Sequence, residues 1–355
     1  MLFLSDRERT LWNEYAQGIL QNSKAPSDYE SLIRSNLRSA FYYYIGTLLA
    51  SKGQYDRTGD WLYAGTLCEE AGLYSSTFLL GFLKRHNGMM KKPAVAFEDP
   101  RPFIHFSTVP VMELARTNMI KQFAHSLPEY SEKTRYMDIG CGDGALTVRL
   151  LKHLLETGKV PGFLEILLID PSSAMISMAR EKVSAAFPDV LITTDNARIQ
   201  DCSESIDRHF DIAMSSLAYH HMPIEDKKVH LSRLKPWIDN FLLFEMDANN
   251  DTPDLDSPEL ALSVYQSYGR IMDFVFSYDA PVEIVIDCID SFLMTELVSL
   301  LTEPRGTRTE YHMLRSQWIE LFKNVLCPDF TLRSDSTCYA DEYCGLFTLH
   351  YGREM

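Results

Sequence analysis

The sequence predicts an α/β protein, with a mostly parallel sheet that follows a helical N-terminal region. From Tyr136 onward, short apolar runs alternate with stretches of helical periodicity. That order builds a parallel sheet with right-handed crossovers. Residues 5–86 instead carry apolar residues at helical spacing. The proline-rich stretch 88–102 separates the two patterns, because proline interrupts helices.

Helix-start signals support the N-terminal interpretation. Ser5 and Glu8 form a capping-box pattern, and Ser27 and Glu30 repeat it. We therefore predict an all-helical cap domain over residues 1–92.

The remaining chain divides into a linker with a helix, residues 93–132, and a sheet domain, residues 133–355. A long helical pattern near the C-terminus, residues 251–310, predicts a helical insertion in that domain. Its apolar stripe runs through Tyr265 and Tyr268. Core packing, a substrate wall and a homodimer surface all suit such a stripe.

Composition limits the partners. The net charge of −15 argues against nucleic acid or an anionic membrane surface, which need a basic face. No apolar run approaches the roughly 20 residues of a membrane span, and the N-terminus does not resemble a signal peptide. The seven cysteines are scattered and odd in number, which favours reduced thiols in the cytoplasm. No His/Cys spacing typical of zinc occurs, so no metal is expected.

A glycine-rich turn ends the first expected strand. Residues 136–144 read Tyr-Met-Asp-Ile-Gly-Cys-Gly-Asp-Gly, and a helical pattern follows. A strand that turns through glycines into a helix presents backbone N–H groups to a ligand. The dinucleotide fingerprint needs its third glycine at the position of Ala145. The stretch instead resembles motif I of the class I S-adenosylmethionine-dependent methyltransferases.

This resemblance implies a Rossmann-like seven-stranded methyltransferase sheet, with an antiparallel last pair, and S-adenosylmethionine as the cofactor. Asp138 would lie near the cofactor's ammonium group. The methionine portion would approach the backbone of the turn, formed by Gly140, Cys141 and Gly142.

The next two strand ends supply further cofactor candidates. The second expected strand ends at Asp170 and Pro171, and one carboxylate can accept from both ribose hydroxyls. The third is followed by adenine-side candidates Asp195, Asn196 and Ala197. The alternatives are a helix N-cap at Asp170 and a local turn after the third strand.

The run Ser-Ser-Leu-Ala-Tyr-His-His, residues 215–221, resembles motif IV of small-molecule methyltransferases. In those proteins it leaves the fourth strand beside the methyl group. Ser215 is therefore a cofactor-binding candidate, and His220 and His221 are candidate general bases. A structural or solvent-exposed role for the two histidines stays open.

A third resemblance concerns residues 245–250, Glu-Met-Asp-Ala-Asn-Asn, which are similar to a GRAS protein segment. Other GRAS-like pieces are 102–107, Tyr265, Asp273-Phe274, 308–312, Trp318 and 343–353. The resemblance covers about residues 100–355. Plant GRAS proteins are transcriptional regulators without a clear glycine motif, so the retained glycines point to the bacterial GRAS-like branch.

The remaining candidates lie on the acceptor side. Glu245 is a third possible base, and Tyr219 and Tyr311 are expected to shape the site. A helix before motif I often lids the cofactor in class I methyltransferases, so His105 could edge the pocket. A buried structural histidine is the alternative.

Together these patterns predict methyl transfer from S-adenosylmethionine to a small-molecule acceptor by in-line displacement, for which alignment supplies much of the acceleration. One alternative is a non-catalytic, GRAS-like protein that binds the cofactor or serves as an interaction scaffold. The other is a protein methyltransferase whose helical hairpins recruit the target.

Overall fold

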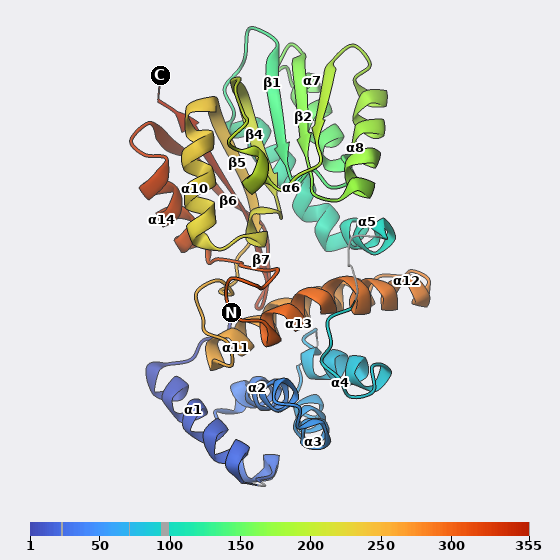
Figure 1. Cartoon of the computed structure of the whole chain (residues 1–355), viewed down its shortest axis with the longest axis vertical. Helices are drawn as coiled ribbons and strands as arrows, with labels where there is room; N and C mark the ends of the chain where they lie inside the picture. The colour runs from blue at the N-terminus through green and yellow to red at the C-terminus, as the bar shows by residue number, and fades with distance from the viewer. Residues whose placement is uncertain (23, 71, 94–98, 355) are drawn as a thin grey trace.

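The computed structural model describes residues 1–22, 24–70, 72–93 and 99–354; residues 94–98 of the predicted linker lie outside this part. Figure 1 shows the sheet with its helices above a layer of N-terminal helices, and other helices cross between them. Within the described ranges, no helix is both long and apolar enough to cross a membrane.

The sheet has seven strands in the order β3-β2-β1-β4-β5-β7-β6, as the fold class predicted. The first five strands are parallel, and β7 is antiparallel to both β5 and β6. The chain therefore leaves β1 towards β2 and returns to its other side with β4, which makes β1 the switch point of the sheet. The strands are β1 (Thr134–Ile139), β2 (Phe163–Ile169), β3 (Leu191–Asp195), β4 (Phe210–Ser216), β5 (Ile238–Met246), β6 (Phe330–Ala340) and β7 (Gly345–Arg353).

Helices cover both faces of the sheet, because its strands are apolar on both sides. Neighbouring residues of β1 enter opposite cores: Tyr136 joins one buried cluster and Met137 the other. The first cluster takes residues from α6 (Pro110–Ser126), α7 (Ala145–Glu156) and α8 (Ser173–Ala186). The second takes them from α9 (Ile199–Cys202), α10 (Ile224–Leu234) and α14 (Arg315–Val325).

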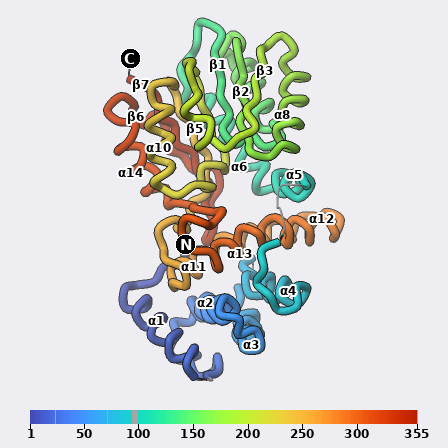
Figure 2. The backbone as a smooth tube through the Cα atoms, in the orientation of Figure 1, coloured from blue at the N-terminus to red at the C-terminus, as the bar shows by residue number. Residues whose placement is uncertain are grey.

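The N-terminal helices and the insertion form one packed layer. Helix α11 packs against α2 and α4, and α13 packs against α2. Figure 2 shows α11–α13 between the sheet and the first four helices. The N-terminal helices are α1 (Asp6–Gln21), α2 (Arg38–Ser51), α3 (Tyr55–Thr66) and α4 (Ser75–Arg85). The insertion contains α11 (Pro258–Phe276), α12 (Val282–Asp287), a π-helical segment (Cys288–Leu293) and α13 (Met294–Thr302).

Close approach of backbones holds this layer together. A Cβ on Gly269 of α11 would lie 1.8 Å from the Ser75 hydroxyl oxygen, so α4 and α11 touch where a side chain would clash. The Ser75 hydroxyl donates to the Tyr265 carbonyl. Tyr265 and Tyr268 of the apolar stripe are buried within the chain. The stripe therefore belongs to the core and is not a dimer surface. The homodimer remains a prediction that this stripe does not support.

One local prediction was wrong. The proline-rich stretch was read as linker through residue 102, but α5 (Pro100–Thr108) already begins at Pro100. Proline is tolerated in the first helical turn, where the N–H has no intrahelical partner. The Asp99 side chain caps this helix by accepting from the Arg101 N–H at 3.0 Å.

Candidate active site

One cavity of about 840 Å³ opens at the carboxyl ends of β1, β2, β4 and β5. Helices α5 and α6 border it on one side, and α11 with the π-helical segment borders it on the other. Open α/β sheets bind ligands at these strand ends, next to the switch point. The volume lies within the roughly 300–1,000 Å³ typical of ligand pockets.

The glycine turn after β1 lines this cavity through Gly140 and Gly142. Gly140 has φ +73°, and a Cβ there would lie 2.3 Å from the Ala218 Cβ. Glycine is therefore required twice at Gly140, by the left-handed conformation and by the close approach of the loop after β4. Cys141, between the two glycines, is buried and does not line the cavity; burial raises the pKa of its thiol.

Asp138 lies behind the turn rather than at the cavity surface. Its side chain is buried, and its Oδ2 accepts from the Thr147 hydroxyl at 2.5 Å. Burial raises the pKa of Asp138 to about 7, against the opposing effect of that hydrogen bond. The sequence predicted that Asp138 lies near the cofactor's ammonium group. In this conformation the carboxyl group is buried behind the turn and does not reach the cavity.

Asp170 does line the cavity, with Pro171 beside it. Its Oδ2 accepts from the Gly142 N–H and its Oδ1 from the Ser172 N–H, both at 2.9 Å. Burial raises the pKa of this carboxyl group. The two backbone bonds fix its orientation, and each oxygen keeps a second lone pair for a ligand hydroxyl.

Only one of the three adenine-side candidates lines the cavity. Ala197 lines the cavity, whereas Asp195 and Asn196 do not. Asp195 ends β3, and its carbonyl accepts from the Asp170 N–H. The Asn196 amide donates to the Asp170 carbonyl at 2.9 Å, so both residues hold the loop that carries Asp170.

Ser215 is also displaced from the cavity. It is fully buried in β4, and its neighbour Ser216 lines the cavity instead. Side chains alternate along a strand, so an error of one position changes the face that a residue occupies.

Arg116 of α6 is a cavity residue that the sequence patterns did not reveal. It is 9% exposed, and its Nε has no hydrogen-bond partner among the described residues. Its Nη1 donates to the Ser107 carbonyl at 3.2 Å. Burial lowers the pKa of this guanidinium to about 10, so it stays charged and can pair with a carboxylate.

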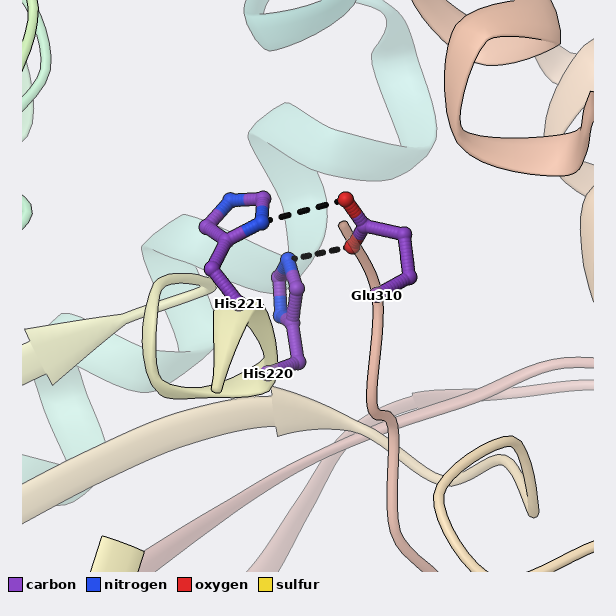
Figure 3. Close-up of side chains that lie close together, drawn as sticks. All are labelled: His220, His221 and Glu310. Atoms are coloured by element: carbon purple, nitrogen blue, oxygen red, sulfur yellow. Dashed lines mark ion pairs between the residues drawn. The ribbon is translucent and has the colours of Figure 1, made fainter. Parts of the chain in front are cut away.

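A histidine–glutamate cluster forms the other end of the cavity. His220 and His221 lie in the turn after β4, Glu245 lies in β5, and Glu310 and His312 lie in the segment between α13 and α14. The His220 Nδ1 lies 2.8 Å from Glu245 Oε2, and its Nε2 lies 3.3 Å from Glu310 Oε2. Figure 3 shows both histidines directed at Glu310, whose Oε1 lies 3.1 Å from His221 Nδ1.

Burial and mutual charge set the ionisation of the cluster. Burial holds the pKa of His220 and of His312 well below the ordinary value, and the neighbouring His221 adds to both effects. Burial also disfavours the charged form of His221, but the Glu310 carboxylate outweighs it and raises the pKa to about 10. Burial raises the pKa of Glu245. The cluster thus combines two neutral imidazoles, His220 and His312, with a protonated His221 beside Glu310.

Backbone bonds hold the Glu310 segment in place. The Tyr311 N–H donates to the His220 carbonyl at 2.6 Å, and the buried Lys227 ammonium donates to the Tyr311 carbonyl at 2.6 Å. The Asn250 N–H donates to the His312 carbonyl at 2.9 Å. Glu310 and His312 therefore point to one side of an extended segment, and Tyr311 points to the other.

The three residues expected to shape the acceptor side do not line the cavity. Tyr219 packs against Phe241 and Trp318 in the core on the far face. The Tyr311 hydroxyl accepts from the Gly306 N–H at 3.0 Å. The remaining residue, His105, stacks on Tyr278, and burial lowers its pKa.

Glu296, Glu310 and His312 line the cavity although none was singled out from the sequence. A period-two reading of residues 308–312 would have separated Glu310 and His312 from Tyr311, the one residue chosen there. Glu296 lies in helix α13, and its Oε2 accepts from the Tyr268 hydroxyl at 3.0 Å. Burial, with Glu310 nearby, raises its pKa well above the ordinary value.

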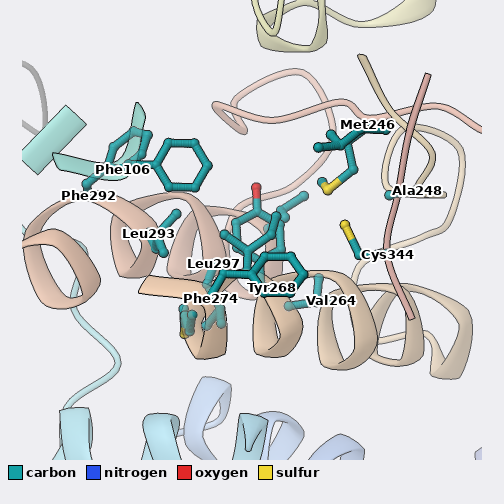
Figure 4. Packing of buried hydrophobic residues seen from close by; sticks show 14 of the residues in the cluster. Phe106, Met246, Ala248, Val264, Tyr268, Phe274, Phe292, Leu293, Leu297 and Cys344 are labelled. Carbon is teal, nitrogen blue, oxygen red and sulfur yellow. The ribbon is translucent and has the colours of Figure 1, made fainter. Parts of the chain in front are cut away.

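Apolar side chains of the insertion cover the histidine–glutamate end. Figure 4 shows the Tyr268 hydroxyl rising from α11, with Phe292 and Leu293 of the π-helical segment to one side. All three line the cavity, as do Phe103 and Phe106 of α5. This wall excludes water and leaves polar groups only at defined places.

Comparisons with known proteins agree with the geometry. Residues 137–238 match the family model described as "Methyltransferase domain". A probable S-adenosylmethionine-dependent methyltransferase of Saccharomyces cerevisiae, CRG1, is 30% identical over 175 residues, which is 49% of this chain and 54% of that protein. The chain thus spans about half the length of the curated relative. These matches agree with the predicted methyltransferase domain over residues 137–238 and with S-adenosylmethionine as its predicted cofactor.

A solved structure resembles nearly the whole chain. SCL7 of Oryza sativa, a GRAS protein, superposes with a TM-score of 0.60 at 12% identity. The match covers 86% of this chain and 98% of that one. At this identity it shows the fold alone.

Proposed function

We propose that this chain, which carries a class I methyltransferase domain, transfers a methyl group from S-adenosylmethionine to a small-molecule acceptor. The observation that carries the proposal is the cavity itself. Gly140, Gly142 and Asp170 line one end of it, and His220, His221 and Glu310 line the other. A candidate cofactor site and a cluster of ionisable groups thus share one cavity.

The residues at the first end fit S-adenosylmethionine. The Asp170 carboxylate is oriented to accept from the ribose hydroxyls, and Ala197 and Ile199 offer an apolar wall to the adenine ring. Arg116 supplies a buried charge with a partnerless Nε, which suits the α-carboxylate of the methionine portion. A Cβ on Gly142 would lie 3.2 Å from the Phe103 ring, so a side chain there would crowd the cavity wall.

Bound there, S-adenosylmethionine supplies the methyl group and carries its own leaving group as a sulfonium. The chain has three tasks: to align the acceptor atom with the methyl carbon, to exclude water and to accept a proton. The histidine–glutamate cluster would accept the proton that the acceptor loses. Of the predicted bases, His220 and His221 line the cavity, whereas Glu245 reaches it through His220.

The covered acceptor end favours a small molecule. An acceptor that reaches Glu310 has to fit beneath Tyr268 and Phe292, which belong to the insertion. A protein substrate would have to insert a side chain past the same wall. The interaction-scaffold alternative would not require proton-accepting groups at the far end of the cofactor cavity.

Calorimetry tests the cofactor half of the proposal. We expect saturable binding of S-adenosylmethionine to the intact chain and roughly 10–100-fold weaker binding to Asp170→Ala, because a charged acceptor of hydrogen bonds contributes about 1.5–3 kcal/mol. The matched control is Asp207→Ala, an exposed aspartate that does not line the cavity. The absence of binding to the intact chain would contradict the proposal.

Label transfer tests the acceptor half. The protein is incubated with methyl-labelled cofactor and cell extract, which is then separated into small molecules and macromolecules. Label in the small-molecule fraction is the expected result. Label in protein would instead favour the protein methyltransferase, and bound cofactor without transfer to any fraction would favour the scaffold.

A further inference from the structure

Three side chains at the acceptor end place donor atoms at metal-ligand spacing. The donor atoms of His220, His221 and Glu310 all lie within 4.8 Å of one another. The two nitrogen–oxygen separations to Glu310 are 3.3 Å and 3.1 Å. A tetrahedral ion with bonds of about 2.0–2.1 Å holds its ligand atoms roughly 3.3 Å apart. Both nitrogen–oxygen separations, one to each carboxylate oxygen of Glu310, are close to this spacing.

Glu245 orients one of these donors. Its Oε2 lies 2.8 Å from His220 Nδ1, and when Glu245 is ionised its carboxylate can only accept, so Nδ1 then carries the proton. The lone pair of the neutral ring then sits on Nε2, which faces Glu310. A histidine that donates its second ring N–H to a carboxylate is the usual arrangement around a protein-bound metal.

Buried atoms without partners mark the same place. Glu310 is 1% exposed, and its Oε2 has no hydrogen-bond partner among the described residues. That oxygen faces His220 Nε2 at 3.3 Å, so two acceptors point at each other. The nearby buried cation, Lys227, is occupied by the Tyr311 carbonyl and lies 3.5 Å from Asp251. An additional cation between Nε2 and Oε2 would satisfy both atoms.

We propose that His220, His221 and Glu310 bind a divalent transition-metal ion, with Glu245 as the carboxylate that positions His220. At His221 the ion would take the place of the proton on Nδ1, a nitrogen that lies 3.1 Å from both the Thr309 carbonyl oxygen and Glu310 Oε1. Two imidazoles and one carboxylate suit zinc, iron or manganese rather than calcium or magnesium, which prefer oxygen ligands.

A second donor set, His220, Glu245 and His312, is less suitable. Its Glu245 Oε2 already accepts from His220 Nδ1, and His312 Nδ1 lies 4.0 Å from that oxygen. His221 and Glu310 both line the cavity, so an ion held there keeps a coordination position open to a ligand. The sequence predicted no metal because the donors are separated by 89 residues, from 221 to 310.

The open position gives the ion a role that rests on the proposed methyl transfer. An acceptor hydroxyl oxygen would bond to the ion, which lowers the pKa of that hydroxyl. Its proton would pass to His312 or Glu245, the members of the histidine–glutamate cluster that do not bind the ion. The acceptor class is therefore a small molecule with a hydroxyl oxygen at the methylated position.

Titration with Zn²⁺ alone tests the site. Untagged protein is dialysed against a chelator and titrated by calorimetry, and Co²⁺ absorption reports the coordination geometry. We expect one saturable site. Glu245→Gln, which preserves the side-chain shape, should weaken binding roughly 10–100-fold, as loss of an outer carboxylate does. His221→Ala and Glu310→Gln, which remove ligands, should weaken it more.

The matched control is His209→Ala. His209 immediately precedes β4, whereas His220 follows it, so the two lie at opposite ends of the strand. Thermal unfolding verifies that each variant is folded. If no variant is stable, the titration of the intact protein is still decisive. Failure of the intact protein to bind Zn²⁺, Co²⁺ and Mn²⁺ overturns the proposal. Equal binding by the intact protein and the folded ligand variants overturns it too.

These titrations contain no S-adenosylmethionine, so their outcome is independent of the cofactor measurement with Asp170→Ala. A metal site without methyl transfer and methyl transfer without a metal site would each be recognised separately.

Discussion

The two ends of the cavity are built by opposite means. At the cofactor end the surface is formed by the glycine turn, by Arg116 and by the Asp170 carboxylate, which two backbone N–H groups hold in place. At the acceptor end, buried ionisable side chains from three distant segments meet: His220 after β4, Glu245 in β5 and Glu310 before α14. A carboxylate held by backbone hydrogen bonds suits the binding of one fixed cofactor, whereas a cluster of ionisable side chains suits proton transfer. The contrast indicates that affinity and turnover are separable by mutation.

His221→Ala should separate them most strongly. Loss of this side chain removes the charged partner of Glu310, which is also the proposed metal ligand, so we expect methyl transfer to fall about 10²–10⁴-fold. Affinity for S-adenosylmethionine should change less than about twofold, because the two backbone hydrogen bonds that orient Asp170 remain. Single-turnover label transfer and calorimetry on the same preparation measure both. A parallel loss of affinity would contradict the division of the cavity.

Gly140→Ala should lower the free energy of unfolding, because it disturbs the contact between the glycine turn and the loop after β4. Its left-handed conformation costs a non-glycine residue about 1–2 kcal/mol, and overpacking against Ala218 adds about 1–3 kcal/mol. The control is Gly158→Ala, which has the same φ of +73° but no atom within 4 Å of the added Cβ. Denaturant unfolding of both isolates the clash. Equal losses of stability would mean that the Ala218 loop yields freely.

The buried carboxyl group of Asp138 provides a pH test at the cofactor end. Its folded-state pKa of about 7 lies above the ordinary aspartate value of 3.8. The folded state therefore binds the proton more tightly than the unfolded state. This contribution is complete below about pH 4 and is lost as pH rises to about 7, by roughly 1 kcal/mol per pH unit within that window.

Asp138→Asn should remove this loss. The free energy of unfolding of the variant, relative to the intact chain, should rise between pH 5 and pH 7. Parallel denaturant curves at the two pH values measure it. An unchanged difference would place the titration of Asp138 outside this window.

Arg116→Met should produce the smallest of these effects. Loss of one charge-assisted pairing at about 1.5 kcal/mol corresponds to roughly tenfold weaker binding of S-adenosylmethionine. Methylthioadenosine, which lacks the α-carboxylate, is the matched ligand, and its affinity should not change. If both ligands weaken equally, Arg116 shapes the cavity and does not recognise the carboxylate.

The same contrast explains which parts the sequence could predict. The glycine turn and Asp170 lie in strand–turn–helix units, where local pattern determines position. The prediction at Ser215 was wrong by one residue, since Ser216 lines the cavity instead. Periodicity identifies a strand more reliably than it assigns the face on which each side chain lies. Glu310 depends on a segment that returns to β5 after a long insertion, and no local pattern encodes that return. The helical cap was predicted, but its packing against α11 was not. That packing depends on contacts between residues far apart in the sequence, such as Ser75 and Tyr265.

A structure of the protein with bound S-adenosylhomocysteine would test the central claim most directly, because it locates both ends of the cavity in one measurement. We expect the ribose hydroxyls at Asp170, the α-carboxylate at Arg116 and the sulfur directed along the cavity towards His221 and Glu310. A ligand bound elsewhere, or with its sulfur directed away from that cluster, would contradict the account.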